Sequence, residues 1–315
     1  MSMRTDNGKI LLSSGTNEVE FMEFYLAGVS YGINVSKVIR VVSLSETQIN
    51  SVPEVPPAIL GVIYDQGKPL KLLDLKQALK LEPKPDSTMR QLIVIARFNK
   101  ETVGFLIDGI QKIHRTTWDQ FQPMTSAIQG GGYTTGTIQY EDRIILILDV
   151  ERLMLDFSSH KPTAELSAPP EPSLKEKRNT KCIVYAEDSK MIRKITSDIM
   201  TASGYTNLKV FENGQDALEY IAHTSEEAHK EGRHLHDYID LIVTDIEMPK
   251  LDGLTLCKRV KTEIQDDHIP AVVVYSSLIN EEMSRKCRTV GADAQLSKPH
   301  GEEIVAIIDK LCFNN

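Results

Sequence analysis

A stretch rich in proline, serine and charged residues divides this chain of 315 residues into two parts. Residues 157–180 read FSSHKPTAELSAPPEPSLKEKRNT and contain few side chains to bury, which is typical of an exposed linker. The chain is also longer than the size at which a single hydrophobic core usually stops growing. We therefore predict two domains, over residues 17–156 and 181–315, joined by a linker over 157–180.

The composition is that of an ordinary soluble globular protein, with 41% hydrophobic and 25% charged residues. The net charge of −8 argues against broad binding to nucleic acid or to anionic membranes. The amino terminus has no long apolar core, and no other stretch approaches the length needed to cross a bilayer. We expect a cytoplasmic protein with no nucleic-acid partner and no direct insertion into a membrane.

Short alternating apolar runs before the linker predict strands of a β-sandwich or barrel. Part of this region is repeated: GVIYDQGKPLKLLDLKQAL begins at Gly61, and GTIQYEDRIILILDVERLM begins at Gly136, without a gap between the two copies. Each copy contains two strands joined by a tight turn, then an aspartate, Asp74 or Asp149, where a helical turn is expected. The repeat predicts two small β-barrels packed together, with both aspartates as helix N-caps.

Strands alternate with amphipathic helices after the linker. Five such units predict a doubly wound parallel sheet, in which ligands bind at the carboxyl ends of the strands. The expected strands cover residues 181–186, 208–211, 240–244, 271–275 and 294–297. The overall prediction is a multidomain chain, with an all-β domain followed by an α/β domain.

Polar residues follow or end four of these five strands. They are Glu187 and Asp188 after the first, Asp245 at the third, Ser276 and Ser277 at the fourth, and Lys298 at the fifth. A single acidic residue after a strand is more often a helix cap than a functional group. Because parallel strands bring their carboxyl ends to one edge, however, the whole set predicts a common site.

The residue types at this edge suit phosphoryl chemistry on a carboxylate. Mg²⁺ prefers hard oxygen ligands, which Glu187, Asp188 and Asp245 supply. Asp245 is then placed to attack phosphorus and form an acyl phosphate. The ammonium of Lys298 and the hydroxyl of Ser276 are suited to stabilise charge on the transferred group.

The part from Lys181 onward resembles the response-regulator receiver domains, through EDS at 187–189, DIEMPKLDG at 245–253 and KP at 298–299. The resemblance implies that Asp245 accepts a phosphoryl group from a histidine kinase and that Glu187 and Asp188 hold Mg²⁺. It also implies that Ser276 is the switch hydroxyl and that Lys298 contacts the phosphoryl group.

Two positions depart from the receiver pattern. Gln295 stands three residues before Lys298, where the family usually has an aromatic residue. Glu247 places an extra carboxylate beside the path of hydrolytic water, and we expect it to reach Mg²⁺ by its backbone carbonyl at most.

The part before the linker contains FYLAGVSYGINVSKVIRVV at 24–42, ILGVIYDQGKPLKLLDL at 59–75 and VGFLIDGIQKI at 103–113, followed by the second repeat. Through these motifs it resembles the CheW family of chemotaxis coupling proteins. The resemblance implies two five-stranded barrels that connect chemoreceptor tips to the histidine kinase CheA. One departure is Gln66, which replaces the arginine of the family's usual Asn-Leu-Arg-Gly turn. A CheW-like domain followed by a receiver is the arrangement of CheV proteins.

These resemblances predict a signalling adaptor between chemoreceptors and CheA, which is modulated by phosphorylation of Asp245 and is not an enzyme. Phosphorylation could tune coupling during adaptation, or the receiver could drain phosphate from the kinase. One alternative is a phosphohydrolase that passes through an aspartyl phosphate, with Glu247 as acid or base. Another is a scaffold whose receiver is inactive.

The second part also contains four histidines close together and all four cysteines of the chain. The cysteines lack the paired spacing of a zinc site and are expected as buried apolar residues; they are Cys182, Cys257, Cys287 and Cys312. The histidines are His223, His229, His234 and His236. Because polar and charged residues surround them, we expect a solvated insertion in preference to a metal site.

Overall fold

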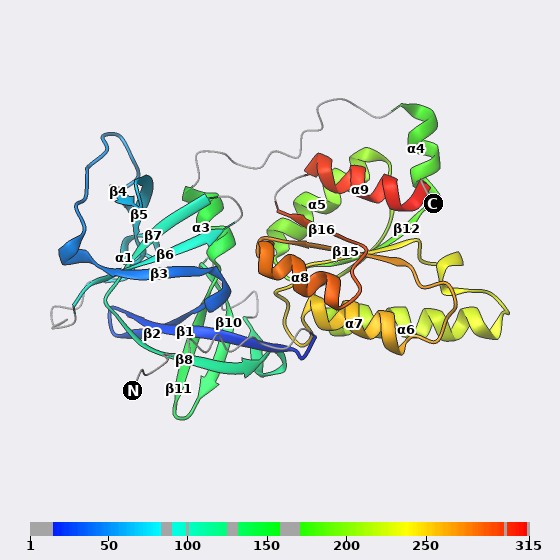
Figure 1. The fold of residues 1–315 in the computed structure, drawn as a ribbon, viewed down its shortest axis with the longest axis horizontal. Coiled ribbons are helices and arrows are strands. Elements are labelled where there is room, and N and C mark those ends of the chain that lie inside the picture. Colours follow the sequence, from blue (N-terminus) through cyan, green and yellow to red (C-terminus); the bar gives the residue numbers. More distant parts are fainter. Residues whose placement is uncertain are drawn as a thin grey trace, which may run out of the picture.

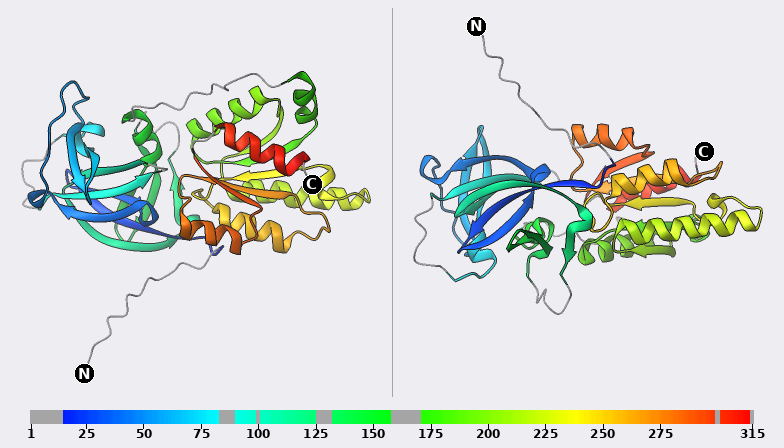
Figure 2. Two further views of the ribbon diagram at one scale, coloured as in Figure 1. Left: turned by 45° about the horizontal axis from the view of Figure 1, so that its top comes forward. Right: turned by 90° about the horizontal axis from the view of Figure 1, so that it is seen from below.

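A computed structural model describes residues 15–82, 90–98, 101–124, 132–157, 171–298 and 301–313. The chain forms a β-rich amino-terminal domain and an α/β carboxyl-terminal domain, which lie side by side in all views (Figure 1, Figure 2). No helix among these residues has the length and apolar character to span a membrane.

The amino-terminal domain contains two sheets. The first has the strand order β8-β1-β2-β11-β10-β9, with β1 Glu18–Leu26, β2 Val29–Asn34, β8 Gly109–Thr117, β9 Phe121–Pro123, β10 Thr134–Tyr140 and β11 Arg143–Leu148. The second has the order β3-β6-β7-β5-β4, with β3 Val38–Ser43, β4 Ile59–Asp65, β5 Lys68–Asp74, β6 Leu92–Phe98 and β7 Glu101–Ile107. Short helical elements connect them: η1 Val35–Lys37, η2 Leu44–Glu46, α1 Leu75–Ala78, η3 Trp118–Gln120 and α3 Val150–Phe157.

The sequence repeat corresponds to a structural repeat. Hairpin β4–β5 followed by α1 matches hairpin β10–β11 followed by α3, and each second strand pairs in parallel with a strand of another hairpin, β5 with β7 and β11 with β2. The short β9 adds a sixth strand to the first sheet. Asp74 and Asp149 accept backbone hydrogen bonds at the starts of α1 and α3, as expected of N-caps.

One hydrophobic core joins the two sheets. Phe24 of β1 and Phe105 of β7 are each 1% exposed and belong to the same cluster, together with Leu148 and Leu153. Truncating a buried aromatic residue of this kind to alanine costs about 3–5 kcal/mol. Leu153 belongs to α3, so this core holds the helix on the amino-terminal domain. The positions of the side chains on the outer face of α3 are fixed in consequence.

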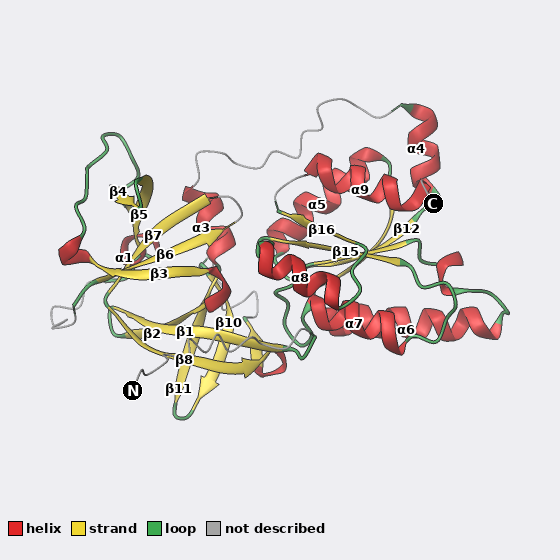
Figure 3. Ribbon diagram, in the orientation of Figure 1, coloured by secondary structure: helices red, strands yellow, loops and turns green. Residues whose placement is uncertain are grey.

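The carboxyl-terminal domain is the predicted doubly wound fold. Its five strands are parallel in the order β13-β12-β14-β15-β16, with β12 Cys182–Ala186, β13 Asn207–Phe211, β14 Leu241–Thr244, β15 Ala271–Ser276 and β16 Ala294–Ser297. Helices cover both faces of the sheet (Figure 3): α5 Lys190–Ser203 and α9 Gly301–Phe313 on one, and α6 Gly214–Lys230, α7 Gly253–Glu263 and α8 Glu281–Thr289 on the other. The strand order reverses between β12 and β14, where ligands bind in such sheets.

The segment expected as a linker contains a helix, α4, over Pro172–Asn179. Its Arg178 is 6% exposed, forms an ion pair with Asp309 of α9 and donates a hydrogen bond to the carbonyl of Ser203. Sequence composition did not indicate this helix, because α4 is anchored by one buried arginine and not by an apolar face.

Candidate functional site

Four strand ends bring the predicted polar residues to one edge of the parallel sheet. Glu187 follows β12, Asp245 follows β14, Ser276 ends β15 and Lys298 follows β16. The strands are in register there, since Ala186 pairs with Thr244 and neighbouring pairs continue to β16. The parallel topology thus produces the convergence that the sequence predicted.

Lys298 lies at the centre of this site. Its Nζ is 2.8 Å from Oδ2 of Asp245 and 2.6 Å from Oε2 of Glu187, and the side chain is 1% exposed. Burial opposes the charge of the ammonium, but attraction to Asp245, Glu187 and Glu151 raises the pKa of Lys298 well above its ordinary value. Lys298 is therefore a permanent cation beside two carboxylates.

Glu187, Asp188 and Asp245 form a cluster of carboxylates around this ammonium. Their ligand oxygens lie within 4.8 Å of one another. Burial, followed by the neighbouring negative charges, raises the pKa of Glu187 to about 8 and that of Asp188 well above its ordinary value. One ammonium does not compensate three carboxylates, so this donor set fits a hard divalent cation such as Mg²⁺.

The loop after β14 fixes the position of Asp245. The backbone N–H of Ile246 donates to Oδ1 of Asp245 over 2.6 Å, and Asp252 accepts hydrogen bonds from Leu254 and Thr255 as the N-cap of α7. A side chain at Gly253 would collide with the backbone carbonyl of Asp245. The last two residues of the motif at 245–253 thus have distinct roles. Asp252 caps the start of α7, and Gly253 lets the helix begin close to the backbone of Asp245.

The two serines at the end of β15 differ in their contacts. Ser276 is fully buried, its Oγ accepts a hydrogen bond from the backbone of Leu278 over 3.4 Å, and its carbonyl accepts from the backbone N–H of Lys298 over 3.3 Å. Ser277 donates its hydroxyl hydrogen to Oε1 of Glu151, in the other domain, over 2.6 Å. The sequence predicted a role at the site for the hydroxyl of Ser276 and none for the hydroxyl of Ser277.

The amino-terminal domain lies directly on this edge of the sheet. Glu247 is held by it through both carboxylate oxygens: Nδ2 of Asn34 donates to Oε1 over 2.7 Å, and Nζ of Lys37 is 2.6 Å from Oε2. The side chain of Glu247 is therefore engaged by the other domain and is not left free beside Asp245.

Glu151 enters the site from the first turn of α3. Besides the bond from Ser277, its Oε2 lies 4.0 Å from Nζ of Lys298 and has no hydrogen-bond partner among the described residues. Burial by itself raises the pKa of Glu151, but attraction to Lys298 and Lys37 outweighs burial and the net shift is downward, so Glu151 is negatively charged.

Further hydrogen bonds join the two domains beside this contact. Asn17 bonds through its backbone N–H to Oγ1 of Thr255 and through its side chain to the backbone of Lys250 and Asp252, over 2.8–2.9 Å. The backbone N–H of Lys250 donates to the carbonyl of Trp118 over 3.1 Å.

Within the contact lies a cavity of about 40 Å³ whose lining includes Glu151, Asp188, Asp245 and Glu247. This volume suffices for a metal ion or a few water molecules.

The residues contributed by the amino-terminal domain were absent from the predicted site. One sequence signal bears on Glu151: the two repeats align Lys76 with Glu151, so the copies carry opposite charges at this position. Lys76 forms an ion pair with Asp108 of its own domain over 2.6 Å, whereas Glu151 points into the other domain. Lys37 and Asn34 lie in an ordinary hairpin-to-strand connection, and no local pattern marks them.

Comparison with known proteins finds one family in each part of the chain. Residues 20–157 match the CheW-like domain family, and residues 183–309 match the response regulator receiver domain family. The chemotaxis protein CheV3 of Helicobacter pylori is 24% identical over 311 residues, which cover 95% of this chain and 96% of that protein.

The chain belongs to the CheV-type chemotaxis proteins.

Two solved structures resemble the domains of this CheV-type protein separately. The scaffolding protein TtCheW of Thermoanaerobacter tengcongensis is 24% identical, with a TM-score of 0.37, over 41% of this chain and 88% of that one. The receiver domain of the histidine kinase CKI1 of Arabidopsis thaliana, solved with Mg²⁺ and BeF₃⁻, is 20% identical, with a TM-score of 0.38, over 44% of this chain and 96% of that one. From here the two parts are called the CheW-like domain and the receiver domain.

Proposed function

We propose that this protein is an adaptor that couples chemoreceptor tips to the histidine kinase CheA and that is modulated by phosphorylation of Asp245. Residues 17–156 form the coupling unit at the receptor array, and residues 181–315 form the receiver. The observation that carries the proposal is the contact of Lys298 with both Asp245 and Glu187, at the sheet edge on which the CheW-like domain lies. A charge change at Asp245 thereby acts directly on the coupling domain.

The phosphoryl transfer uses Asp245 as nucleophile. A carboxylate oxygen of Asp245 forms a bond to phosphorus, the bond from phosphorus to the donor nitrogen of a phosphohistidine breaks, and the electron pair leaves with that nitrogen. Lys298 neutralises charge on the transferred oxygens, and the backbone N–H of Ile246 holds Asp245 in position. Mg²⁺, held by Glu187, Asp188 and Asp245, would supply further charge neutralisation.

The adaptor proposal accounts for the contact between the domains better than an enzymatic role does. A phosphohydrolase with Glu247 as acid or base needs that carboxyl free to approach water or substrate. Asn34 and Lys37 instead hold both of its oxygens. Modulation of coupling and drainage of phosphate from the kinase both use the same acyl phosphate at Asp245.

The acceptor role is tested by incubating the full chain with Mg²⁺ and acetyl phosphate and following the intact mass. We expect one phosphoryl group on the wild-type protein, none on Asp245→Asn, and a strongly reduced yield on Lys298→Ala. Unchanged labelling of Asp245→Asn would overturn the assignment of the phosphoacceptor.

A further inference from the structure

Asp245 is almost inaccessible in the full chain. Its side chain is 2% exposed, and the cavity that it lines has a volume of only about 40 Å³ and is also lined by Asn34, Lys37 and Glu151 of the CheW-like domain. A phosphodonor therefore reaches Asp245 only when the CheW-like domain has moved away from the receiver. Accessibility of the acceptor and docking of the two domains are thus coupled by geometry.

Glu151 contacts Lys298, which a phosphoryl group on Asp245 would need, and Ser277, which directly follows Ser276. A transferred phosphoryl group requires cations and hydrogen-bond donors around its oxygens. The Ser277 hydroxyl already donates to Glu151, and the Lys298 ammonium is 4.0 Å from the second Glu151 oxygen. A phosphoryl group brings a charge of about −1.5 to −2 and three strong acceptor oxygens into the same buried space. Repulsion between this group and the Glu151 carboxylate is strong because little water screens it.

We propose, on the basis of the proposed function, that Glu151 is an internal competitor of the phosphoryl group: its carboxylate holds the unphosphorylated receiver against the CheW-like domain, and phosphorylation of Asp245 expels it. Expulsion moves the Glu151 carboxylate out of the buried contact between the domains. It also exposes the face of the CheW-like domain around Asn34, Lys37 and Trp118. By linkage the effect is reciprocal, so docking of the CheW-like domain lowers the equilibrium extent of phosphorylation at Asp245. Because docking also buries Asp245, it slows the reaction with a phosphodonor. The opposite charge of Lys76 at the matching position of the first repeat restricts this role to the second copy.

The test compares the rate of phosphorylation by acetyl phosphate in full-length wild type, Glu151→Ala and Glu151→Gln. We expect Glu151→Ala to be phosphorylated on the order of tenfold faster than wild type, because a larger fraction of this variant is undocked, and Glu151→Gln to lie between them. The matched control is Asp156→Ala, because Asp156 is an exposed carboxylate on the same helix. Circular dichroism verifies that each variant is folded.

A second readout follows docking itself. Trp118 is the only tryptophan of the chain and lines the interdomain cavity, so its fluorescence reports separation of the domains. We expect acetyl phosphate to change this fluorescence in wild type but not in Asp245→Asn, and Glu151→Ala to show the changed signal before phosphorylation. Equal or slower labelling of Glu151→Ala relative to wild type would overturn the competition while leaving the phosphoacceptor in place. Absence of labelling in all of the proteins would overturn the proposed function itself.

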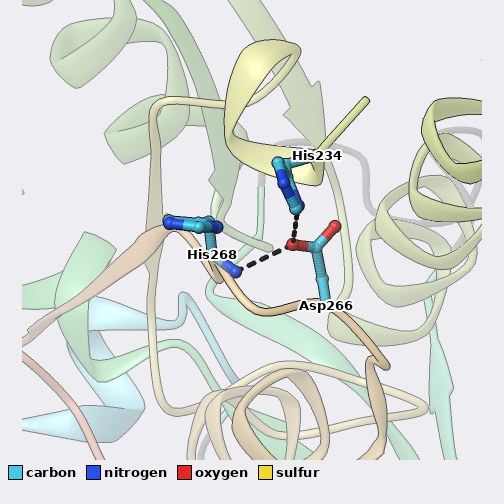
Figure 4. A group of neighbouring side chains, drawn as sticks. All are labelled: His234, Asp266 and His268. Atoms are coloured by element: carbon cyan, nitrogen blue, oxygen red, sulfur yellow. Dashed lines mark hydrogen bonds and ion pairs between the residues drawn. The ribbon is translucent and has the colours of Figure 1, made fainter. Parts of the chain in front are cut away.

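A different observation supports a second site at the other end of the receiver sheet. His234 and Asp266 precede β14 and β15, and therefore lie at the amino ends of the strands, away from Asp245. Nδ1 of His234 is 3.2 Å from Oδ1 of Asp266, and the rings of His234 and His268 are 4.6 Å apart between centroids (Figure 4). The ligand atoms of these three residues all lie within 4.8 Å of one another.

The carboxylate of this cluster is held in place by backbone groups. The side chain of Asp266 is 0% exposed and accepts hydrogen bonds from the backbone N–H groups of Leu235 and His268, over 2.7 and 2.8 Å. His229 adds a further imidazole, with Nε2 3.6 Å from Oδ2 of Asp266. Imidazole nitrogens around one carboxylate form a donor set that suits Zn²⁺ and similar transition metals and does not suit Mg²⁺.

We infer that His234, His268 and Asp266 form a surface site for a divalent transition metal, with His229 as an additional ligand. Sequence composition alone favoured a solvated insertion, because His268 and Asp266 come from the α7–β15 connection and lie beside the other histidines only in the folded chain. A bound ion would tie that connection to the end of α6.

The metal site is tested by titrating the full chain with Zn²⁺ by calorimetry, with excess Mg²⁺ present to occupy the carboxylates around Asp245. We expect one tight site in wild type and at least tenfold weaker binding in His234→Ala and His268→Ala. His223→Ala is the matched control, because this exposed histidine lies on α6 outside the cluster. Zn²⁺ binding that is unchanged in both cluster variants, or absent from wild type, would overturn the inference.

Discussion

Nζ of Lys37 in the CheW-like domain lies 2.6 Å from Oε2 of Glu247 in the receiver, two residues beyond Asp245. Both side chains are about nine-tenths buried. A buried ion pair is weak evidence of net stabilisation, because desolvation offsets the attraction, but removal of one partner leaves an uncompensated charge. This pair therefore makes docking of the domains sensitive to charge at the edge of the sheet that carries Asp245.

The first prediction concerns that pair. Lys37→Met leaves the Glu247 carboxylate buried without its cation, so we expect docking to weaken by about 3–5 kcal/mol. Adding Glu247→Gln removes the orphaned charge and should restore part of the loss. Trp118 fluorescence during a urea titration measures both effects. Strictly additive losses in the double variant would contradict a direct interaction.

A second prediction concerns the balance of charge around Lys298. Lys298→Met leaves Glu187, Asp188 and Asp245 without a neighbouring cation, so in the presence of a chelator we expect unfolding to become easier by about 3–5 kcal/mol. Mg²⁺ should recover more stability in this variant than in wild type, as judged by the melting temperature with Mg²⁺ and with chelator. Lys194→Met is the control, since the exposed pair of Lys194 with Asp198 contributes only about 0.3–0.5 kcal/mol. An equal Mg²⁺ effect in wild type and Lys298→Met would count against this charge balance.

The fold was largely predictable because the relevant signals are local. Apolar runs, turn residues and the two aligned repeats predict both sheets, and the parallel topology converts four separate strand ends into one site around Asp245. The contributions of Lys37 and Glu151 were not predictable, because they depend on how the two domains meet. The proximity of His234 and His268 likewise depends on tertiary structure, because they lie in different connections of the receiver.

A third prediction concerns the pH dependence of thiol reactivity. Burial raises the pKa of Cys257, Cys287 and Cys312 to about 12, and also raises that of Cys182. A higher pKa means less thiolate at a given pH, so at pH 8 only about one thiol in ten thousand is reactive where the pKa is about 12. We expect Ellman's reagent to react slowly with the native protein, about tenfold faster for each pH unit between 8 and 10, and rapidly with all four thiols in denaturant. A rate that levels off near pH 9 in the native protein would contradict the raised pKa values.

A fourth prediction tests whether α4 belongs to the receiver. Arg178 pairs with Asp309 and bonds to Ser203, so Arg178→Ala should lower the free energy of unfolding of the receiver by about 3–5 kcal/mol, as for other broken buried pairs. Lys177→Ala, at an exposed neighbouring position of the same helix, should change it by less than about 0.5 kcal/mol. Thermal melts of the two variants decide this point. Indistinguishable melting temperatures would show that the helix contributes nothing to the receiver.

We propose that phosphorylation of Asp245 changes how the CheW-like domain couples receptors to the kinase. The most direct test measures CheA activity in reconstituted receptor arrays with wild-type protein and with Asp245→Asn, each with and without acetyl phosphate. We predict that acetyl phosphate changes kinase activity with wild-type protein and leaves it unchanged with Asp245→Asn, while both proteins support coupling. The same response to acetyl phosphate with both proteins would contradict the account.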